Sequence, residues 1–218
     1  MLINPWDDDV YGEANYVINV NEGSEGSSTL KWQVYIVDSN NYANLDYDKV
    51  HDDQIEWFRK ETDYGKSIAG DYVPNLTFMH IPFEEFDEAW EEKAGHKQGG
   101  GTDSDGYAYY MGEQVSCSSQ TNDFYETMQE RNTKGVIVAH DHINLTDWHY
   151  NKDNKGEIRL IYGLKTGHGI YHDERIMGAS FYTLKDDGTF TNERYGVDYN
   201  LDVKLIDDAY ISQMAWEA

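Results

Sequence analysis

The sequence predicts an α/β (α+β) sandwich in which helices flank a mixed sheet. Residues 136–139 and 75–80 are short apolar runs, and the first is rich in β-branched residues, as expected for strands covered on both faces. Residues 52–60 and 120–133 have the composition and spacing of helices. Alternating runs towards the C-terminus add antiparallel strands.

The first part of the chain predicts a hairpin followed by a helix. Residues 15–20 and 31–37 favour strands, and a polar loop rich in Gly and Ser separates them at 21–29. Residues 52–60 favour a helix because Asp52 and Asp53 place negative charge at the positive end of its dipole.

The middle of the chain alternates between strands and helices. A strand at 75–80 is followed by an acidic, helix-like tract at 83–90. The glycine-rich stretch 98–106 is predicted to be a flexible insertion, because no Lys-Ser/Thr follows it and a phosphate-cradling loop requires that pair. A helix within 120–133 would lead into the strand at 136–139.

The last part predicts a closing antiparallel sheet. Its strands are expected at 158–162, at 178–184 and within 197–205, with a turn at Asp187-Gly188.

The composition limits the classes of partner. The chain has 218 residues, a formal net charge of −24 and a large share of aromatic residues, with 18 Tyr and 6 Trp. Binding to nucleic acid or to an anionic membrane requires a surplus of Lys and Arg, so neither partner is expected. The single cysteine, Cys117, rules out an internal disulfide.

Three histidines stand where predicted strands end. The run VIVAHDHIN at residues 136–144 places His140 and His142 in the loop after a buried strand, and His80 ends the strand at 75–80. Ligand sites of α/β sheets gather at such strand ends, and imidazole is the commonest nitrogen ligand for transition metals. These histidines are therefore the candidate metal ligands.

With these motifs the chain resembles the calcineurin-like metallophosphoesterases, and within them the branch related to purple acid phosphatases. That family's last two motifs are a lone His after a strand and then Gly-His-x-His. The resemblance covers roughly residues 11 to 190, and it is carried, in order, by residues 11–17, 34–39, 54–58, the His80 segment, Glu113, the His140 loop and residues 162–175.

The resemblance implies a metal-dependent phosphoesterase that hydrolyses phosphomonoesters or phosphodiesters with a metal-activated water. Two divalent or trivalent ions (Fe, Zn or Mn) would lie about 3.5–4 Å apart in the complete domain. His80 and His140 would bind one ion and His142 the other. Asp141, as a carboxylate orienting an imidazole, and His168, as a residue lining the cleft, are the catalytic candidates, and the substrate would be a phosphorylated small molecule or a phosphoprotein.

The chain departs from the family pattern in two respects. Ala139 stands where the family has glycine, and its methyl group is expected to tighten the approach to the metal. The family's first three blocks, Asp-x-His, Gly-Asp-x-x-Asp and Gly-Asn-His-Asp/Glu, which supply the carboxylates, have no counterpart in the expected order.

The missing blocks lead to a specific expectation. Residues 1–218 would form a single partial domain, the C-terminal half of the four-layer metallophosphoesterase fold, whose partner is the missing N-terminal half. Such a chain would hold at most one weakly bound ion and would expose an apolar or open edge where the other half packs. The alternative is a non-catalytic acidic interaction or binding domain left by truncation.

Overall fold

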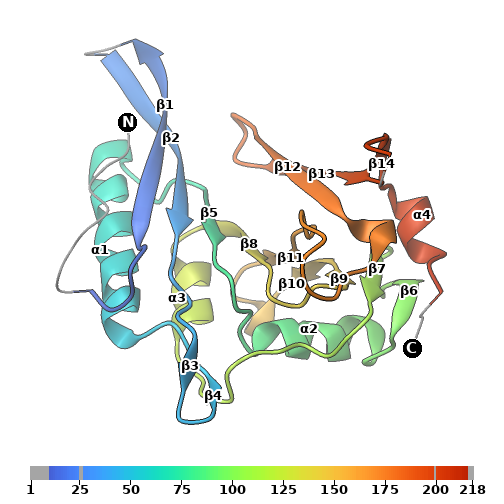
Figure 1. Ribbon diagram of the computed structural model, residues 1–218. Coiled ribbons are helices and arrows are strands. Elements are labelled where there is room, and N and C mark those ends of the chain that lie inside the picture. Colours follow the sequence, from blue (N-terminus) through green and yellow to red (C-terminus); the bar gives the residue numbers. More distant parts are fainter. Residues whose placement is uncertain (1–9, 25–26, 199, 216–218) are drawn as a thin grey trace.

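A six-stranded mixed sheet organises the protein in the computed structural model, which describes residues 10–24, 27–198 and 200–215 (Figure 1). In spatial order the strands are β1 (Tyr16–Ser24), β2 (Ser27–Ile36), β5 (Asn75–Phe78), β8 (Thr133–Val138), β11 (Ile158–Tyr162) and β10 (Asp147–Tyr150). The protein is therefore a mixed α/β structure, as predicted.

The direction of the strands determines where a site can form. Strands β2, β5, β8 and β11 pair in parallel, whereas β1 and β10 run antiparallel at the two edges. The carboxyl ends of the four central strands consequently meet at one edge of the sheet, where the loops that follow them lie side by side.

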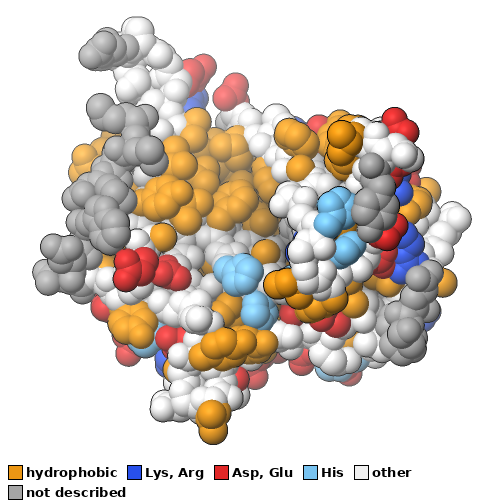
Figure 2. All heavy atoms as spheres, viewed as in Figure 1, with side chains coloured by type: hydrophobic (Ala, Val, Ile, Leu, Met, Phe, Trp, Pro, Cys, Tyr) orange, Lys and Arg blue, Asp and Glu red, His pale blue; other side chains and the backbone are white. Residues whose placement is uncertain are grey.

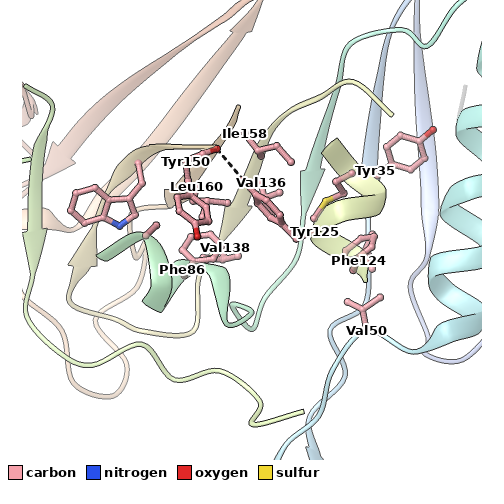
Figure 3. Close-up of a cluster of buried hydrophobic side chains, with 14 of the residues drawn as sticks. Tyr35, Val50, Phe86, Phe124, Tyr125, Val136, Val138, Tyr150, Ile158 and Leu160 are labelled. Atoms are coloured by element: carbon pink, nitrogen blue, oxygen red, sulfur yellow. Dashed lines mark hydrogen bonds between the residues drawn. The ribbon is translucent and has the colours of Figure 1, made fainter. Parts of the chain in front are cut away.

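One face of the sheet is covered by three helices. These are α1 (Asp52–Ala69), α2 (Glu85–Ala94) and α3 (Phe124–Glu130). Tyr35, Val136 and Leu160 point from the sheet into this layer and are fully buried (Figure 3). The hydroxyl of Tyr125 donates to the Tyr150 carbonyl at 2.9 Å, whereas the buried hydroxyl of Tyr35 has no hydrogen-bond partner among the described residues.

The opposite face is only partly covered. Strands β12 (Gly178–Leu184) and β13 (Phe190–Val197) form a hairpin that β14 (Val203–Leu205) extends. Phe190 of this hairpin packs on Trp32, Leu76 and Ile137 of the main sheet. Away from the hairpin, hydrophobic side chains gather in the open over β1 and β2 (Figure 2).

That uncovered region consists of the side chains that alternate onto the hairpin side of the sheet. All are half-buried or exposed, and they are Tyr16, Ile18, Val20, Val34 and Ile36. Phe78 lies on the same side of the sheet but packs edge to face on Tyr182 of the hairpin, with ring centroids 5.6 Å apart. The sequence predicted an apolar surface of this kind, but it lies on the face of the sheet and not along an edge strand. We call it the open sheet face.

Two smaller sheets complete the described structure. One contains β6 (Gly99–Thr102), β7 (Ala108–Met111) and β9 (Asn144–Leu145), and the other is the hairpin of β3 (Tyr42–Ala43) and β4 (Asp46–Tyr47). The remaining helices are α4 (Asp208–Ser212) and the 3₁₀ turns η1 (Lys152–Asn154) and η2 (Glu174–Ile176). Among the described helices, none is long and apolar enough to cross a membrane.

Most predicted elements are present, but several bounds were wrong. The predicted loop at 21–29 is largely paired strand, since β1 continues to Ser24 and β2 starts at Ser27; residues 25–26 lie outside the described residues. The helix predicted at 52–60 extends to Ala69 and stops where Gly70 adopts a left-handed conformation (φ 92°). The helix predicted within 120–133 is limited to Phe124–Glu130.

The glycine-rich stretch is not a flexible insertion. Residues Gly99–Thr102 of this stretch form strand β6, and a Cβ atom on Gly100 would lie 2.3 Å from the backbone oxygen of Ile211 in α4. Glycine is therefore required here for close backbone packing, which composition alone does not distinguish from a flexible loop.

Candidate functional site

The carboxyl ends of β5 and β8 bring His80 and His140 into contact. The His140 Nδ1 atom lies 3.3 Å from His80 Nε2, and the two rings meet edge to face with centroids 5.2 Å apart. The two residues are 60 positions apart in the chain. Their meeting follows from the parallel pairing of β5 with β8, which places the loops after the two strands side by side.

Backbone hydrogen bonds hold the two loops together. The Ala139 N–H donates to the His80 carbonyl at 3.1 Å, and the Ser39 hydroxyl accepts from the N–H groups of His80 and Ile81. His140 itself has a positive φ of 67°, which is uncommon for a residue with a side chain and marks a tightly determined turn. Ala139 is exposed, so its methyl group points to solvent and does not crowd the loop.

The separation of the two ring nitrogens suits a shared metal ion. Two nitrogens at about 2.0–2.1 Å from one tetrahedral ion lie roughly 3.3–3.4 Å from each other. The observed 3.3 Å falls in that range. The same distance also suits a hydrogen bond from a protonated ring nitrogen to an unprotonated one. The geometry therefore provides two imidazole nitrogens that could bind one ion, and it does not by itself define a metal centre.

His142 does not join this pair in the same way. Its Nδ1 lies 3.0 Å from the Tyr171 carbonyl oxygen, and its ring stacks on the Tyr171 ring with centroids 4.4 Å apart. A ring nitrogen facing a carbonyl carries the proton, which leaves Nε2 as the nitrogen with a free lone pair. His142 is thus held as a separate imidazole whose Nε2 is the available donor.

Glu113 fixes the loop that contains His142. One carboxylate oxygen accepts the Tyr171 hydroxyl at 2.8 Å and the other accepts the Ile143 N–H at 3.1 Å. Both contacts neighbour His142, because Ile143 follows it and Tyr171 stacks on it. Glu113 therefore sets the position of the imidazole without touching it.

The described residues contain no third ligand near the pair. Across residues 10–24, 27–198 and 200–215, no group of three or more His, Cys, Asp or Glu side chains is placed to hold a metal ion. The structure brings together two of the three predicted ligands, His80 and His140, and keeps His142 on Tyr171.

Asp141 lies in the site loop but points into the protein. It is buried, and its carboxylate accepts hydrogen bonds from the Tyr162 hydroxyl at 2.5 Å and the Ser116 N–H at 3.1 Å. These bonds anchor the loop to β11 and to the segment after β7. The sequence raised Asp141 as a carboxylate that orients an imidazole, whereas these contacts give it a structural role.

His168 is exposed and belongs to another surface. It faces His172 edge to face with ring centroids 5.6 Å apart. The pocket beside it contains none of the three candidate ligands His80, His140 and His142. Its described lining residues are His168, Glu174, Arg175, Met177, Val197, Asp198 and Lys204. Histidine side chains correspondingly gather at two separate places on one face of the molecule (Figure 2).

The imidazole pair is expected to titrate below the ordinary range of histidine. Partial burial lowers the pKa of His80, as do the neighbouring His140 and His142; partial burial also lowers the pKa of His140, although Asp141 opposes the shift. Proton NMR of the two ring Cε1–H signals against pH should show midpoints below the ordinary histidine pKa of about 6.5. Midpoints at or above that value would contradict the described packing.

The sign of the linked stability change follows from the direction of these shifts. Since the folded pKa values lie below the unfolded value, the unfolded chain binds more protons as the pH falls. The stability that the neutral pair contributes is present above about pH 6.5 and is lost progressively below it.

Sequence reasoning assigned no role to the residues that surround the histidines. Glu113 and Tyr171 fell within the segments that carry the family resemblance, but nothing in their pattern indicated a contact with His142. Tyr47, whose ring packs edge to face on His140 with centroids 4.5 Å apart, lies in a stretch without periodicity.

A scan against models of known protein families finds no match, and a search of curated proteins finds no significant similarity.

Proposed function

We propose that this chain supplies the histidine ligands of a metal-dependent phosphoesterase. The observation that carries the proposal is the pair of imidazoles of His80 and His140 at the carboxyl ends of adjacent parallel strands. The Nδ1 atom of His140 lies 3.3 Å from Nε2 of His80. A pair of neutral imidazoles at a sheet edge is suited to binding a borderline metal such as Zn or Fe. The resemblance to the calcineurin-like metallophosphoesterases supports the same assignment.

In the proposed site each histidine has a defined task. His80 and His140 would hold one ion, and His142 would hold the second through its Nε2. When bound, such ions polarise the phosphoester and lower the pKa of a bound water to near neutrality. The substrate would be a phosphorylated small molecule or a phosphoprotein, hydrolysed as a phosphomonoester or phosphodiester.

The ligand set needs carboxylates beyond those near the pair. Glu113 is occupied by Tyr171 and Ile143, and Asp141 by Tyr162 and Ser116. Imidazoles alone do not neutralise two cations. We therefore propose that the carboxylates come from a further segment, the N-terminal half of a metallophosphoesterase domain, and that the present chain corresponds to the C-terminal half of that four-layer fold.

The open sheet face supports this arrangement. Its apolar side chains adjoin the edge of the sheet that carries the histidines, since Ile36 ends β2, which pairs with the strand β5 that leads to His80. A second sheet packed on this face would remove apolar surface from water, and each Å² buried would contribute about 25 cal/mol of stabilisation. It would also bring new side chains to the histidine edge.

Metal titration tests the proposal directly. Stripped of metal and titrated with Zn²⁺ at pH 7 in a calorimeter, the chain is expected to bind at most one ion, weakly, because only two imidazoles are in place. The His80→Ala, His140→Ala double variant should lose this binding. His149→Ala is the matched control, since that imidazole stacks on Tyr107 and contacts Glu157 away from the pair; an unchanged isotherm for the double variant would refute the site.

A second candidate function is a non-catalytic acidic interaction domain. The open sheet face together with the net charge of −24 favours it, because an exposed apolar surface within a strongly acidic one suits a protein partner. Absence of Zn²⁺ binding in the titration would favour this candidate over the phosphoesterase.

A further inference from the structure

Residues 166–172, between β11 and η2, form a short surface segment that we call the latch. The first six of them are exposed. A Cβ atom added to Gly167 or Gly169 would meet no heavy atom of the described residues within 4 Å, so the backbone stands clear of its surroundings at both glycines. The chain that leads into the latch is fixed, because Lys165 pairs with Met177 in a parallel bridge.

Tyr171 ties the latch to the loop that contains His142. Its carbonyl oxygen lies 3.0 Å from His142 Nδ1, and its ring stacks on the imidazole with centroids 4.4 Å apart. Its hydroxyl donates to Glu113 at 2.8 Å. Both polar contacts lie at the surface, where water can replace a hydrogen bond at small net cost. One residue therefore holds the latch against His142 by contacts that can be exchanged for water.

The residue before Tyr171 opposes this arrangement. Ile170 has a φ of 62°, and its side chain is 77% exposed. A β-branched residue rarely adopts positive φ, because its side chain crowds the backbone there, and such a conformation persists only where surrounding contacts impose it. Packing of the exposed Ile170 side chain cannot impose it, whereas the contacts of the adjacent Tyr171 can. The latch is therefore strained while Tyr171 lies on His142.

Release of Tyr171 would free two chemical groups together. His142 Nδ1 would lose its carbonyl partner, and the Glu113 oxygen that accepts the Tyr171 hydroxyl would become available. The other Glu113 oxygen accepts the Ile143 N–H at 3.1 Å, which keeps the carboxylate next to the His142 loop. The latch consequently covers an imidazole and a carboxylate that are neighbours.

We propose that the latch is a gate over His142 and Glu113, held shut by Tyr171 and kept close to opening by the backbone strain at Ile170. Every contact in this device is made between residues of the chain itself, so the motion requires no bound ion or substrate. Its role as a control on access to the histidine site rests on the proposed function, whereas the motion does not.

Relaxation-dispersion NMR of the chain without added metal tests the gate. Exchange between the closed and open latch is expected on the microsecond to millisecond timescale at the backbone amides of Ile143 and Tyr171. Tyr171→Phe keeps the stacked ring but removes the hydroxyl bonded to Glu113, and should raise the open population roughly threefold to tenfold. Ile170→Asn should lower that population by a similar factor, because asparagine tolerates positive φ and no buried contact is lost.

Tyr64→Phe is the matched control. It removes the hydroxyl of a tyrosine on α1 that is 57% exposed, against 51% for Tyr171, and should leave the exchange unchanged. Absence of exchange in both the wild type and Tyr171→Phe would overturn the gate, as would a larger open population in Ile170→Asn.

The Zn²⁺ titration separates the gate from the proposed function. If the latch variants change the exchange as expected while the chain binds no Zn²⁺, the gate stands and the phosphoesterase proposal fails. Zn²⁺ binding that requires His80 and His140, found together with exchange that neither latch variant alters, would support the phosphoesterase proposal and overturn the gate.

Discussion

The purified chain is expected to hydrolyse a chromogenic phosphomonoester no faster than its His80→Ala, His140→Ala double variant. Bound phosphate needs two cations, and those cations need a bridging carboxylate that the described site lacks, because Asp141 and Glu113 are engaged elsewhere. Release of the chromophore with Zn²⁺, Mn²⁺ or Fe²⁺ present measures this. Metal-dependent turnover that disappears in the double variant would show that the chain needs no further segment.

Supplying the missing carboxylates should change that result. A polypeptide with the Asp-x-His, Gly-Asp-x-x-Asp and Gly-Asn-His-Asp/Glu blocks, fused to the chain or added separately, is expected to give two-metal binding and turnover. In that complex His142→Ala should cost several kcal/mol of transition-state stabilisation through the loss of one ion. Metal binding without hydrolysis would limit the family resemblance to structure and leave the interaction domain as the better proposal.

The same segment should cover the open sheet face. Val34 and Ile36 are half-buried in the described structure, and a docked sheet would remove them from solvent. Restoration of turnover therefore ought to coincide with protection of β1 and β2 from hydrogen exchange. Turnover without that protection would place the added segment elsewhere on the protein.

The sequence was most informative where the pattern is local. An apolar run that ends in His80 and another that ends in His140 are local features, and parallel strand pairing is sufficient to bring their ends together. The contact of His142 with Tyr171 was not predictable in this way, because it joins two loops and depends on how residues 163–173 fold back. Tyr47 reaches His140 from a hairpin whose turn contains no glycine, so the usual hairpin signal was absent.

The contacts between the main sheet and the β12–β13 hairpin could not be predicted from the sequence either. Asp147 lies on β10, which the sequence did not identify as a strand, yet it connects the main sheet to the β12–β13 hairpin. Its carboxylate accepts two hydrogen bonds from Arg159 at 2.8 and 2.5 Å, one from Asn192 at 3.1 Å and one from Arg194 at 3.4 Å. Such a cluster depends on residues up to 47 positions apart, which no local pattern can show.

Asp147→Ala is expected to destabilise the protein by about 3–5 kcal/mol, because it leaves the largely buried guanidinium groups of Arg159 and Arg194 without their shared carboxylate. Although burial tends to raise the pKa of Asp147, the hydrogen bonds and charges of the two arginines outweigh it and lower that pKa. The contribution of Asp147 is therefore fully present above the unfolded pKa of about 3.9 and is lost as the pH falls through the lower folded value. Urea unfolding of the wild type and of Asp147→Ala at pH 7 and at pH 3 measures this, and the difference between their free energies of unfolding should shrink at the lower pH.

Asp208→Ala is the matched control. It removes an exposed carboxylate 3.6 Å from the same Arg194 and should cost no more than about 1 kcal/mol. Equal losses for the two variants would mean that the burial of the cluster, and not the charge of Asp147, holds the hairpin on the sheet.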